Sequence, residues 1–498
     1  MQPPPSPPRR RSLVCVAWIL FSILVSPATA LADDPPPPAP HITVLVQDAP
    51  AIGGPASALA KSWEIRTGGK VTVVKRPFGE LFQTISRGIR TDPATYDVIF
   101  YAPAWAGDLH HDLQPLPQSL RRHESFDDIH ETYRDRLMQW NGEWIAVTVD
   151  GDLFSGYYRK DLFADPAAGA AFRAEYGREL LPPQTWEDYR DIARFFTGRR
   201  AADGTLLYGT AEPFARGGQQ FWDLFSRASA YTNHPDLPGG QFFHPETMQA
   251  QINNPGWVRA VREYREALSY SPPDALGYGI VQSRQAFIHR AQTALALDWG
   301  DTGQMSADKA QSPISGKVGY FVLPGTREVW NWRQQHWDSL PRIHKAPFLA
   351  FGGWVASVPR TSRHPDAAWD FIMWYASPEN SLDAVVTSGT GINPYRYTHF
   401  SNIDAWSKAF SHNAASEYLG VLRASLDSPH AALDLRIPGF HEYTEILEEG
   451  LTAVLKNNAD PQHAMDDVAR GWDAVTDRLG RDRQLALYRA SMGLPPQP

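Results

Sequence analysis

Acidic and aromatic side chains stand where the predicted strands of this sequence end. Asp48 follows a strand predicted over residues 42–46, and Tyr101 ends a strand predicted over residues 96–101, with Trp105 shortly after it. Flat aromatic faces stack on the C–H surface of a sugar ring, and carboxylates accept hydrogen bonds from hydroxyl groups. With 17 Trp, 19 Tyr and 23 Phe, the chain has more aromatic residues than packing alone usually recruits, which favours a cleft that binds sugar-like compounds.

The elements that must position these residues alternate between strands and helices. Strands predicted over 42–46, 71–74 and 96–101 are separated by helical patterns over 56–67 and 78–90. This order predicts a parallel sheet, and the ligand crevice of such a sheet lies beyond the carboxyl ends of its strands. Asp48 and residues 101–105 therefore belong to loops that approach one place.

Further signals continue along the chain. Asn141-Gly142 is typical of a hairpin turn, and the apolar strand over 153–158 opens what we interpret as a second lobe. Thr185 is a candidate cap for a helix over 186–196. The remaining predicted elements are helices over 257–270 and 282–289, strands over 294–297, 317–323 and 354–358, and a mainly helical region beyond Pro365.

The N-terminus has the pattern of an export signal. Arg9-Arg10-Arg11 precede an apolar run over 13–25 and small residues at Ala28, Ala30 and Ala32. We predict a signal peptide over 1–32 with cleavage after Ala32, by the general or the twin-arginine route, and an extended, proline-rich leader over 33–40. No later stretch approaches the ~20 apolar residues of a membrane span, so we expect a soluble, periplasmic or otherwise extracytoplasmic protein. Cys15, the only cysteine, would be removed with the signal.

Composition and missing motifs exclude several classes of function. A formal charge of −8 does not favour binding to nucleic acid or to anionic lipid. P-loop, Gly-x-Gly-x-x-Gly, Gly-x-Ser-x-Gly and His-Glu-x-x-His patterns are absent. His110-His111 is the nearest approach to a metal pair, but adjacent side chains of a strand or helix are expected to point apart. We predict no metal, no cofactor and no catalytic residues.

Four stretches resemble one known family. They are 96–101 (YDVIFY) with Leu113-Gln114-Pro115-Leu116, 157–163 (YYRKDLF) followed by 183–189 (PQTWEDY), 351–354 (FGGW) leading to a helix over 364–375, and 436–443 (RIPGFHEY). Together they are similar to the bacterial extracellular solute-binding proteins of sugar ABC importers, the maltose-binding-protein-like family. The resemblance runs from about His41 to Leu479, and 481–498 looks like an added tail.

The resemblance implies an α/β fold of periplasmic-binding-protein type II, with two discontinuous α/β lobes, a hinge and a ligand cleft between them. Crossings are expected near 149–152, 297–300 and 352–354. The first lobe would take 41–149 and a return segment over 300–352. The second lobe would take 150–299 and 353–498, the latter including the C-terminal helices.

The resemblance also implies which residues contact ligand. The first lobe would contribute Asp48, Tyr101 and Trp105, and the crossing Asp150 and Asp152. The second lobe and the later crossings would contribute Glu212, Phe214, Trp222, Asp298, Trp299, Trp354, Asn393, Arg396 and Arg436. The expected ligand is a small neutral polar compound, a sugar or oligosaccharide, passed by a monomeric binding protein to an ABC importer permease.

Three alternatives stay open from the residues. A secreted carbohydrate-active enzyme would need two carboxylates on either side of one scissile bond, which Asp150 and Asp152 could mimic. A binding protein of the same fold could take a polyol or another non-sugar cargo. A structural surface protein would leave the aromatic residues at predicted strand ends unexplained.

Overall fold

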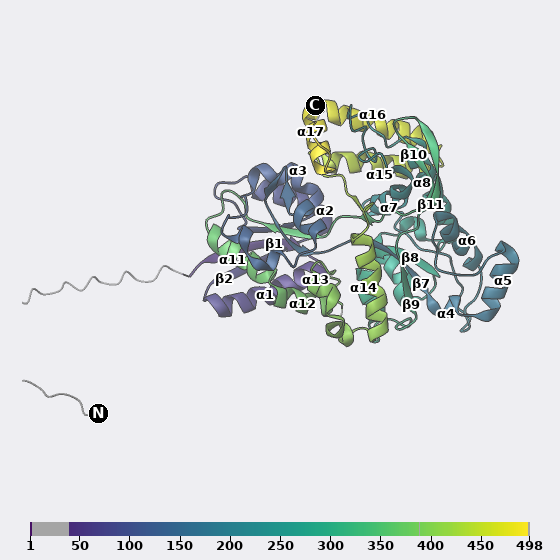
Figure 1. Ribbon diagram of the computed structural model, residues 1–498, viewed down its shortest axis with the longest axis horizontal. Coiled ribbons are helices and arrows are strands. Elements are labelled where there is room, and N and C mark those ends of the chain that lie inside the picture. The colour runs from purple at the N-terminus through teal and green to yellow at the C-terminus, as the bar shows by residue number, and fades with distance from the viewer. Residues whose placement is uncertain (2–38, 388, 497–498) are drawn as a thin grey trace, which may run out of the picture. The chain divides into compact units, whose positions relative to one another are not determined.

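The computed structural model describes Met1, residues 39–387 and residues 389–496 (Figure 1). The predicted signal peptide beyond Met1 and the predicted leader up to residue 38 lie outside the described residues. Within the described part of the chain, no helix combines the length and the apolar character needed to cross a membrane.

The first lobe is built on a five-stranded sheet with the strand order β2-β1-β3-β13-β6. β1 pairs in parallel with β2 and with β3, which confirms the parallel order predicted for the start of the chain. β13 runs antiparallel to both β3 and β6. The strands are β1 (His41–Gln47), β2 (Lys70–Arg76), β3 (Val98–Tyr101), β6 (Val147–Asp150) and β13 (Trp354–Ser357).

Helices α1, α2 and α11 contact this sheet, and α12 continues from α11. α1 has a proline at its first position and ends at Gly68, whose φ of 73° is the left-handed conformation that glycine adopts without strain. The bounds are α1 (Pro50–Thr67), α2 (Phe78–Gly88), α3 (Ala106–Leu109), α11 (Pro365–Tyr375) and α12 (Pro378–Val386). The predicted hairpin at Asn141-Gly142 is confirmed, joining β4 (Gln139–Trp140) to β5 (Glu143–Trp144).

The second lobe is built on a three-stranded antiparallel sheet with the order β8-β7-β9. Its strands are β7 (Phe154–Arg159), β8 (Leu295–Trp299) and β9 (Val318–Phe321). A long hairpin, β10 (Thr326–Asn331) and β11 (His336–His344), lies against α7. Two short strands, β12 (Phe348–Leu349) and β14 (Ala432–Leu433), pair in parallel.

The second lobe contains most of the helices. Thr185 caps α6 as predicted, because its hydroxyl accepts from the Asp188 N–H and the Asp188 carboxylate accepts from the Thr185 N–H. The bounds are α4 (Lys160–Phe163), α5 (Pro166–Tyr176), α6 (Trp186–Phe196), α7 (Gln220–Thr232), α8 (Pro255–Ala267), α9 (Ile280–Arg284), α10 (Asp301–Ala307) and α14 (His412–Leu426). α13 (Tyr397–Ser401) contacts both α12 and α14, and its Thr398 is hydrogen-bonded to Asp128 of the first lobe.

The return segments differ from the sequence-based assignment. Residues 300–352 were expected in the first lobe, but β9 pairs with β7 in the second sheet. Residues 353–498 were expected in the second lobe, but β13 pairs between β3 and β6 in the first sheet. The chain therefore passes between the sheets from β6 to β7 and again from β12 to β13, and not near 297–300. Short, fully buried strands carry no sequence signal for their partner, so periodicity could not assign them.

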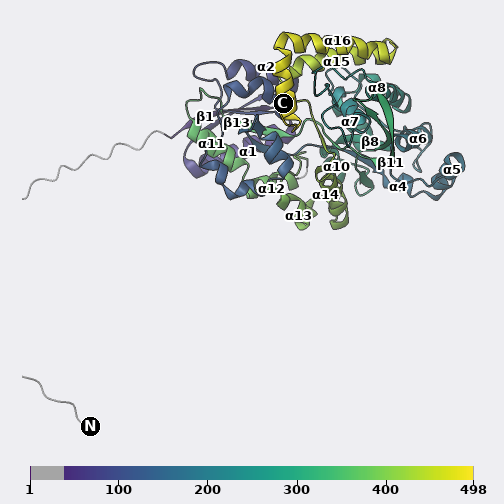
Figure 2. The same cartoon turned by 45° about the horizontal axis from the view of Figure 1, so that its top comes forward.

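Three helices close the chain. α15 (Phe440–Lys456) and α16 (Pro461–Leu479) lie side by side, as Figure 2 shows, and α17 (Arg481–Ser491) follows. The predicted tail is thus helical over most of its length. α17 is held to the second lobe by Tyr488, whose hydroxyl donates to the Gly239 carbonyl at 2.7 Å, and to the first lobe by Arg136, which donates to the Ser491 carbonyl at 3.2 Å.

Candidate functional site

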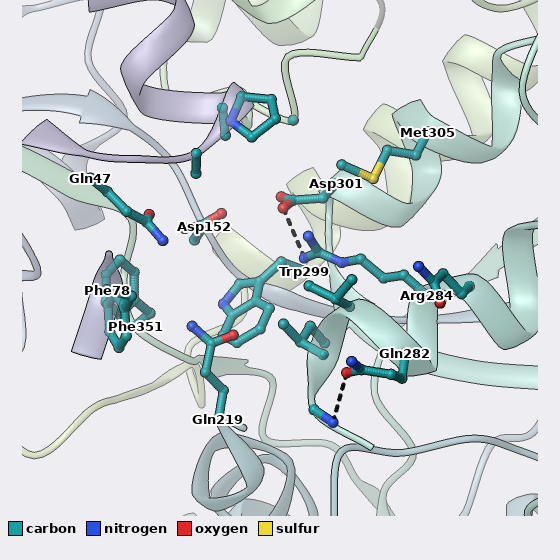
Figure 3. Close-up of a pocket in the computed structure, with 18 of the residues that line it drawn as sticks. Gln47, Phe78, Asp152, Gln219, Gln282, Arg284, Trp299, Asp301, Met305 and Phe351 are labelled. Atoms are coloured by element: carbon teal, nitrogen blue, oxygen red, sulfur yellow. Dashed lines mark hydrogen bonds and ion pairs between the residues drawn. The ribbon is translucent and has the colours of Figure 1, made fainter. Parts of the chain in front are cut away.

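A cavity of about 960 Å³ lies between the two lobes (Figure 3). The carboxyl end of β1 and the first residues of α1 and α2 line it from the first lobe, as expected for the edge where parallel strands end. From the second lobe it is lined by the loop before α7, by α9 and by the end of β8 with the start of α10. The segments where the chain passes between the lobes, around Asp152 and Trp354, also line it.

Aromatic rings form one apolar part of the lining. Phe78, at the start of α2, lies 5.7 Å from Phe351 and 6.3 Å from Trp354, measured between ring centroids. Trp299 ends β8, and its indole N–H donates to the Ala350 carbonyl at 2.8 Å, which fixes the ring. These rings give flat faces of the kind that pack on the C–H surface of a sugar or polyol.

Carboxylates gather beside the rings. Asp150 ends β6, Asp152 follows it on the passage to the second lobe, and Asp301 begins α10. The Asn393 amide nitrogen donates to Asp152 Oδ1 and, at 2.8 Å, to Asp301 Oδ1. Asp150 Oδ1 accepts from the backbone N–H groups of Gly151 and Asn393. Among the described residues, the Oδ2 atoms of Asp150 and Asp152 have no hydrogen-bond donor.

Burial and repulsion by neighbouring acids disfavour the charged form of Asp150 and Asp152. The pKa of Asp150 is raised well above its ordinary value, first by burial and then by the charge of Asp301. The pKa of Asp152 is raised well above its ordinary value for the same reason, with Asp150 and Asp301 both adding to the effect of burial. Asp150 and Asp152 therefore hold protons more tightly than exposed carboxyl groups do.

One cation faces this acidic cluster. Arg284, on α9, donates to both oxygens of Asp298 at 2.6 and 3.0 Å, and its Nη2 lies 2.8 Å from Asp301 Oδ2. Figure 3 shows Arg284 and Asp301 on the same wall of the cavity as Trp299. Arg284 Nη1 has no acceptor among the described residues. The wall thus presents a free guanidinium donor close to free carboxylate acceptors.

Four of the residues predicted from the sequence line the cavity, namely Asp150, Asp152, Trp299 and Trp354. Three more lie directly behind the lining. Asp298 holds Arg284, Asn393 holds Asp152 and Asp301, and Trp222 lies 5.7 Å from Trp299 between ring centroids.

Three predicted residues from the ends of the first and third strands lie outside the lining. Asp48 is flanked by Gln47 and Ala49, which do line the cavity. Tyr101 is buried in the sheet, where its hydroxyl accepts from Ser357 at 3.1 Å. Trp105 packs against Phe78 and Phe82. The strand ends were located correctly, but which residue of each loop faces the cavity depends on the backbone path, which periodicity does not specify.

The structure places four other predicted residues away from the cavity lining. Glu212 is 0% exposed and forms an ion pair with Arg227 at 2.7 Å. Phe214 packs on Tyr264. Arg396 donates to the carbonyls of Ser125 and Ala376, and Arg436 donates to four backbone carbonyls, those of Pro103, Arg136, Leu137 and Gln139. The polar groups of Glu212, Arg396 and Arg436 already have partners within the fold, and the Phe214 ring is packed, whereas a sequence gives only the residue types.

Sequence reasoning missed Phe78, Arg284, Asp301, Gln47 and Gln219, which all line the cavity. Signals existed for two of them. Phe78 opens the helix predicted after the second strand, at the same edge of the sheet as Asp48, and Asp301 follows Trp299 by two residues. Nothing in the sequence distinguishes Arg284 from the other arginines on predicted helices.

His110 and His111 do not point apart as predicted. They lie in a short 3₁₀ turn, and their ring centroids are 3.8 Å apart. Among the residues that the structure describes, no group of three or more His, Cys, Asp or Glu side chains is arranged to hold a metal ion.

Comparison with known proteins adds to this geometry. The family model for bacterial extracellular solute-binding proteins matches residues 58–409. The mannitol-binding protein of Pseudomonas aeruginosa is 24% identical over 303 residues, a stretch that covers 60% of this chain and 60% of that protein.

The fold recurs in many solved structures, including two with bound ligand. The solute-binding protein of an ABC transporter from Agrobacterium radiobacter K84, in complex with ribitol, matches with a TM-score of 0.70 at 21% identity, over 88% of this chain and 98% of that one. Maltose-bound MalE3 of T. maritima matches with a TM-score of 0.67 at 19% identity, over 88% of this chain and all of that one.

Proposed function

Because the chain belongs to the family of bacterial extracellular solute-binding proteins, we propose that it captures a small, neutral polyhydroxy compound between its lobes for delivery to an ABC importer. The ligand class is a sugar or a sugar alcohol. A sugar alcohol is supported by the relatives whose names or ligands are mannitol and ribitol, and a sugar by the maltose-bound neighbour.

The observation that carries this proposal is the wall formed by Arg284, Asp152 and Trp299. Every hydroxyl group can donate one hydrogen bond and accept others, so a polyhydroxy ligand can accept from the free Nη1 of Arg284 and donate to the free Oδ2 of Asp152. The Trp299 ring would cover the C–H face of the same ligand. An anionic ligand would lie beside Asp301 and beside Asp150 and Asp152, whose charged forms are already disfavoured, while Arg284 is already paired with Asp298 and Asp301; this disfavours an anion.

Binding without chemical conversion fits the same wall. A glycosidase needs one of its carboxyl groups as an acid poised at the scissile bond and a second as base or nucleophile. Asp150 is 2% exposed, and its Oδ1 is already held by two backbone N–H groups. We infer that these acids bind hydroxyl groups and are not a catalytic pair.

Capture would couple to a hinge motion. The cavity takes its lining from both lobes, so a ligand bound to both shifts the protein toward its closed form. We further propose that the N-terminal signal exports the chain, that it acts as a monomer outside the cytoplasm, and that its closed form docks on a membrane permease.

A thermal-shift screen of residues 33–498 tests the proposal. The panel contains mannitol, ribitol, maltose, tagatose, glycerol phosphodiesters and gluconate, because a ligand that binds only the folded state raises the melting temperature. We expect a shift with one neutral class, loss of that shift in Trp299→Ala, and its retention in Trp337→Ala, whose ring lies in the β10–β11 hairpin outside the cavity. The absence of a shift with every neutral compound would overturn the proposal.

A further inference from the structure

Asn393 is a fully buried residue on the segment that joins α12 to α13, only 1% exposed. Its backbone is fixed against the first passage between the lobes. The Asn393 N–H donates to Asp150 Oδ1 at 2.7 Å, and its carbonyl accepts from the Gly151 N–H at 3.3 Å. The side chain therefore starts from a position that the fold determines.

The side-chain amide lies at the centre of the acidic cluster. Its nitrogen has two hydrogens and three acceptors within reach, namely Asp152 Oδ1, Asp301 Oδ1 at 2.8 Å and the Gly391 carbonyl at 3.2 Å. Its oxygen has no donor among the described residues and points at Gly300, where a Cβ would come within 1.9 Å of it. Glycine at position 300 gives the amide its space.

This amide joins carboxylates from two different parts of the chain. Asp152 lies on the passage between the lobes, whereas Asp301 belongs to α10 of the second lobe. Both carboxylates also line the cavity, and Asp152 keeps its Oδ2 free. An N–H donor between two carboxylates offsets their repulsion, and no other side chain among the described residues donates to both.

We propose that Asn393 is a positioning residue, which holds Asp152 and Asp301 at the spacing that ligand hydroxyl groups require without touching the ligand itself. This inference rests on the proposed function, and it replaces the ligand contact expected for Asn393 from the resemblance.

The effect of replacing Asn393 should depend on pH, because several ionisable groups lie close together around it. Replacing the amide by a carboxylate removes the donor and adds an acid, so the cluster must take up a proton to restore a hydrogen bond. The charged and titratable groups that face the cluster from the surrounding elements are Asp150, Asp152, Asp298, Asp301, Arg284, Tyr133, Tyr375, Tyr395 and Tyr418.

The test compares Asn393→Asp with the swap Asp301→Asn/Asn393→Asp, using the neutral ligand that the screen identifies. We expect Asn393→Asp to weaken binding at least about tenfold at pH 7.5 and to recover to within about threefold at pH 5. The swap keeps the number of acids unchanged and restores one donor, because the amide at position 301 can donate to the acid at position 393. It should bind at least about fivefold more tightly than Asn393→Asp at pH 7.5. Asn402→Asp makes the same charge change at an exposed position and should bind like the wild type.

Equal affinity of Asn393→Asp and wild type at pH 7.5, or a loss that is the same at pH 5 and pH 7.5, would overturn the proposal. If Asn393→Asp does not fold, the swap decides: a folded swap that binds supports the positioning role, and a swap that fails to fold or to bind contradicts it.

A ligand-free measurement separates this inference from the proposed function. The melting temperature of Asn393→Asp relative to wild type should fall further as the pH rises from 5 to 8, whatever the ligand is. A pH-independent difference would contradict the role of Asn393 even if a ligand is found. If no neutral compound binds the wild type, the proposed function fails while this readout still reports on Asn393.

Discussion

Asp223 is a carboxyl group that the fold buries without a partner. It is 0% exposed, and neither oxygen has a hydrogen-bond donor among the described residues. Burial raises its pKa well above the ordinary value of 3.8, and the charges of Glu212 and Asp298 add to the effect. Because the folded state holds this proton more tightly than the unfolded chain, the stability it contributes is greatest below about pH 4 and declines as the pH rises.

We therefore expect Asp223→Asn to stabilise the protein increasingly with pH, since an amide needs no extra proton. For each pH unit above the ordinary carboxyl range, the free energy of unfolding of the wild type falls by at most about 1.4 kcal/mol relative to that of the amide variant. Urea unfolding at pH 5 and pH 8 measures the effect, with the exposed Asp383→Asn as control. A variant less stable than wild type by the same amount at both values would contradict this account of Asp223.

Glu212 provides a second test at the residue scale, because the sequence suggested a ligand contact and the structure places it in an interior ion pair with Arg227. Glu212→Gln should destabilise the fold by about 3 kcal/mol, since it leaves a buried guanidinium without its counter-charge. Ligand affinity of the folded variant should stay within about threefold of wild type. Calorimetric titration and urea unfolding measure the two quantities, with Glu187→Gln, an exposed partner of Arg259, as control.

A large loss of affinity in Glu212→Gln with unchanged stability would mean that Glu212 contacts the ligand after all. The comparison with Glu187→Gln guards against a general effect of removing an acid, because exposed ion pairs contribute at most about 1 kcal/mol.

At the scale of elements, the cap of α6 was read directly from the sequence and can be tested as such. Thr185→Ala removes the hydroxyl that accepts from the Asp188 N–H and should cost about 1 kcal/mol of stability. Thr185→Ser keeps the acceptor and should stay within a few tenths of a kcal/mol of wild type. Thermal or urea unfolding separates the two, and equal losses in both variants would show that the methyl group, not the cap, matters.

Local sequence signals predicted most helices and strands, but they could not predict which strands pair when the strands are far apart in the sequence. Thr185, the Asn141-Gly142 turn and the parallel start of the first sheet depend on residues near in sequence, and all three were confirmed. The sheets that receive β9 and β13 depend on packing between segments far apart, which one sequence does not encode in a readable pattern. The site divides differently: the family resemblance implied Asp150, Asp152, Trp299 and Trp354 at the expected crossings, and these four line the cavity, whereas Arg284 was not predicted.

At the scale of the whole molecule, the charge of the cavity determines which ligands the protein excludes. Arg284 is already paired with Asp298 and Asp301, and Asp150 and Asp152 lie beside them, so an acidic analogue would be repelled and would also lose its hydration without gaining a free counter-charge. We expect gluconate to bind at least about 100-fold more weakly than the corresponding neutral polyol at pH 7.5. The affinity of the neutral ligand should change less than about twofold between 20 and 300 mM salt, because no net ligand charge is screened.

Competition titrations at the two salt concentrations measure both effects. Tighter binding of gluconate than of the neutral polyol would contradict the assignment of Asp152 and Asp301 as acceptors of hydroxyl groups.

The central claim is reversible capture of a neutral polyhydroxy compound in the cavity between the lobes. Isothermal titration of residues 33–498 with the compound selected by the thermal-shift screen tests it most directly, followed by mass spectrometry of the recovered ligand. The account predicts saturable binding of one ligand per chain, recovery of the ligand unchanged, and loss of the heat signal in Trp299→Ala. Chemical conversion of the ligand, or equal binding by Trp299→Ala, would contradict it.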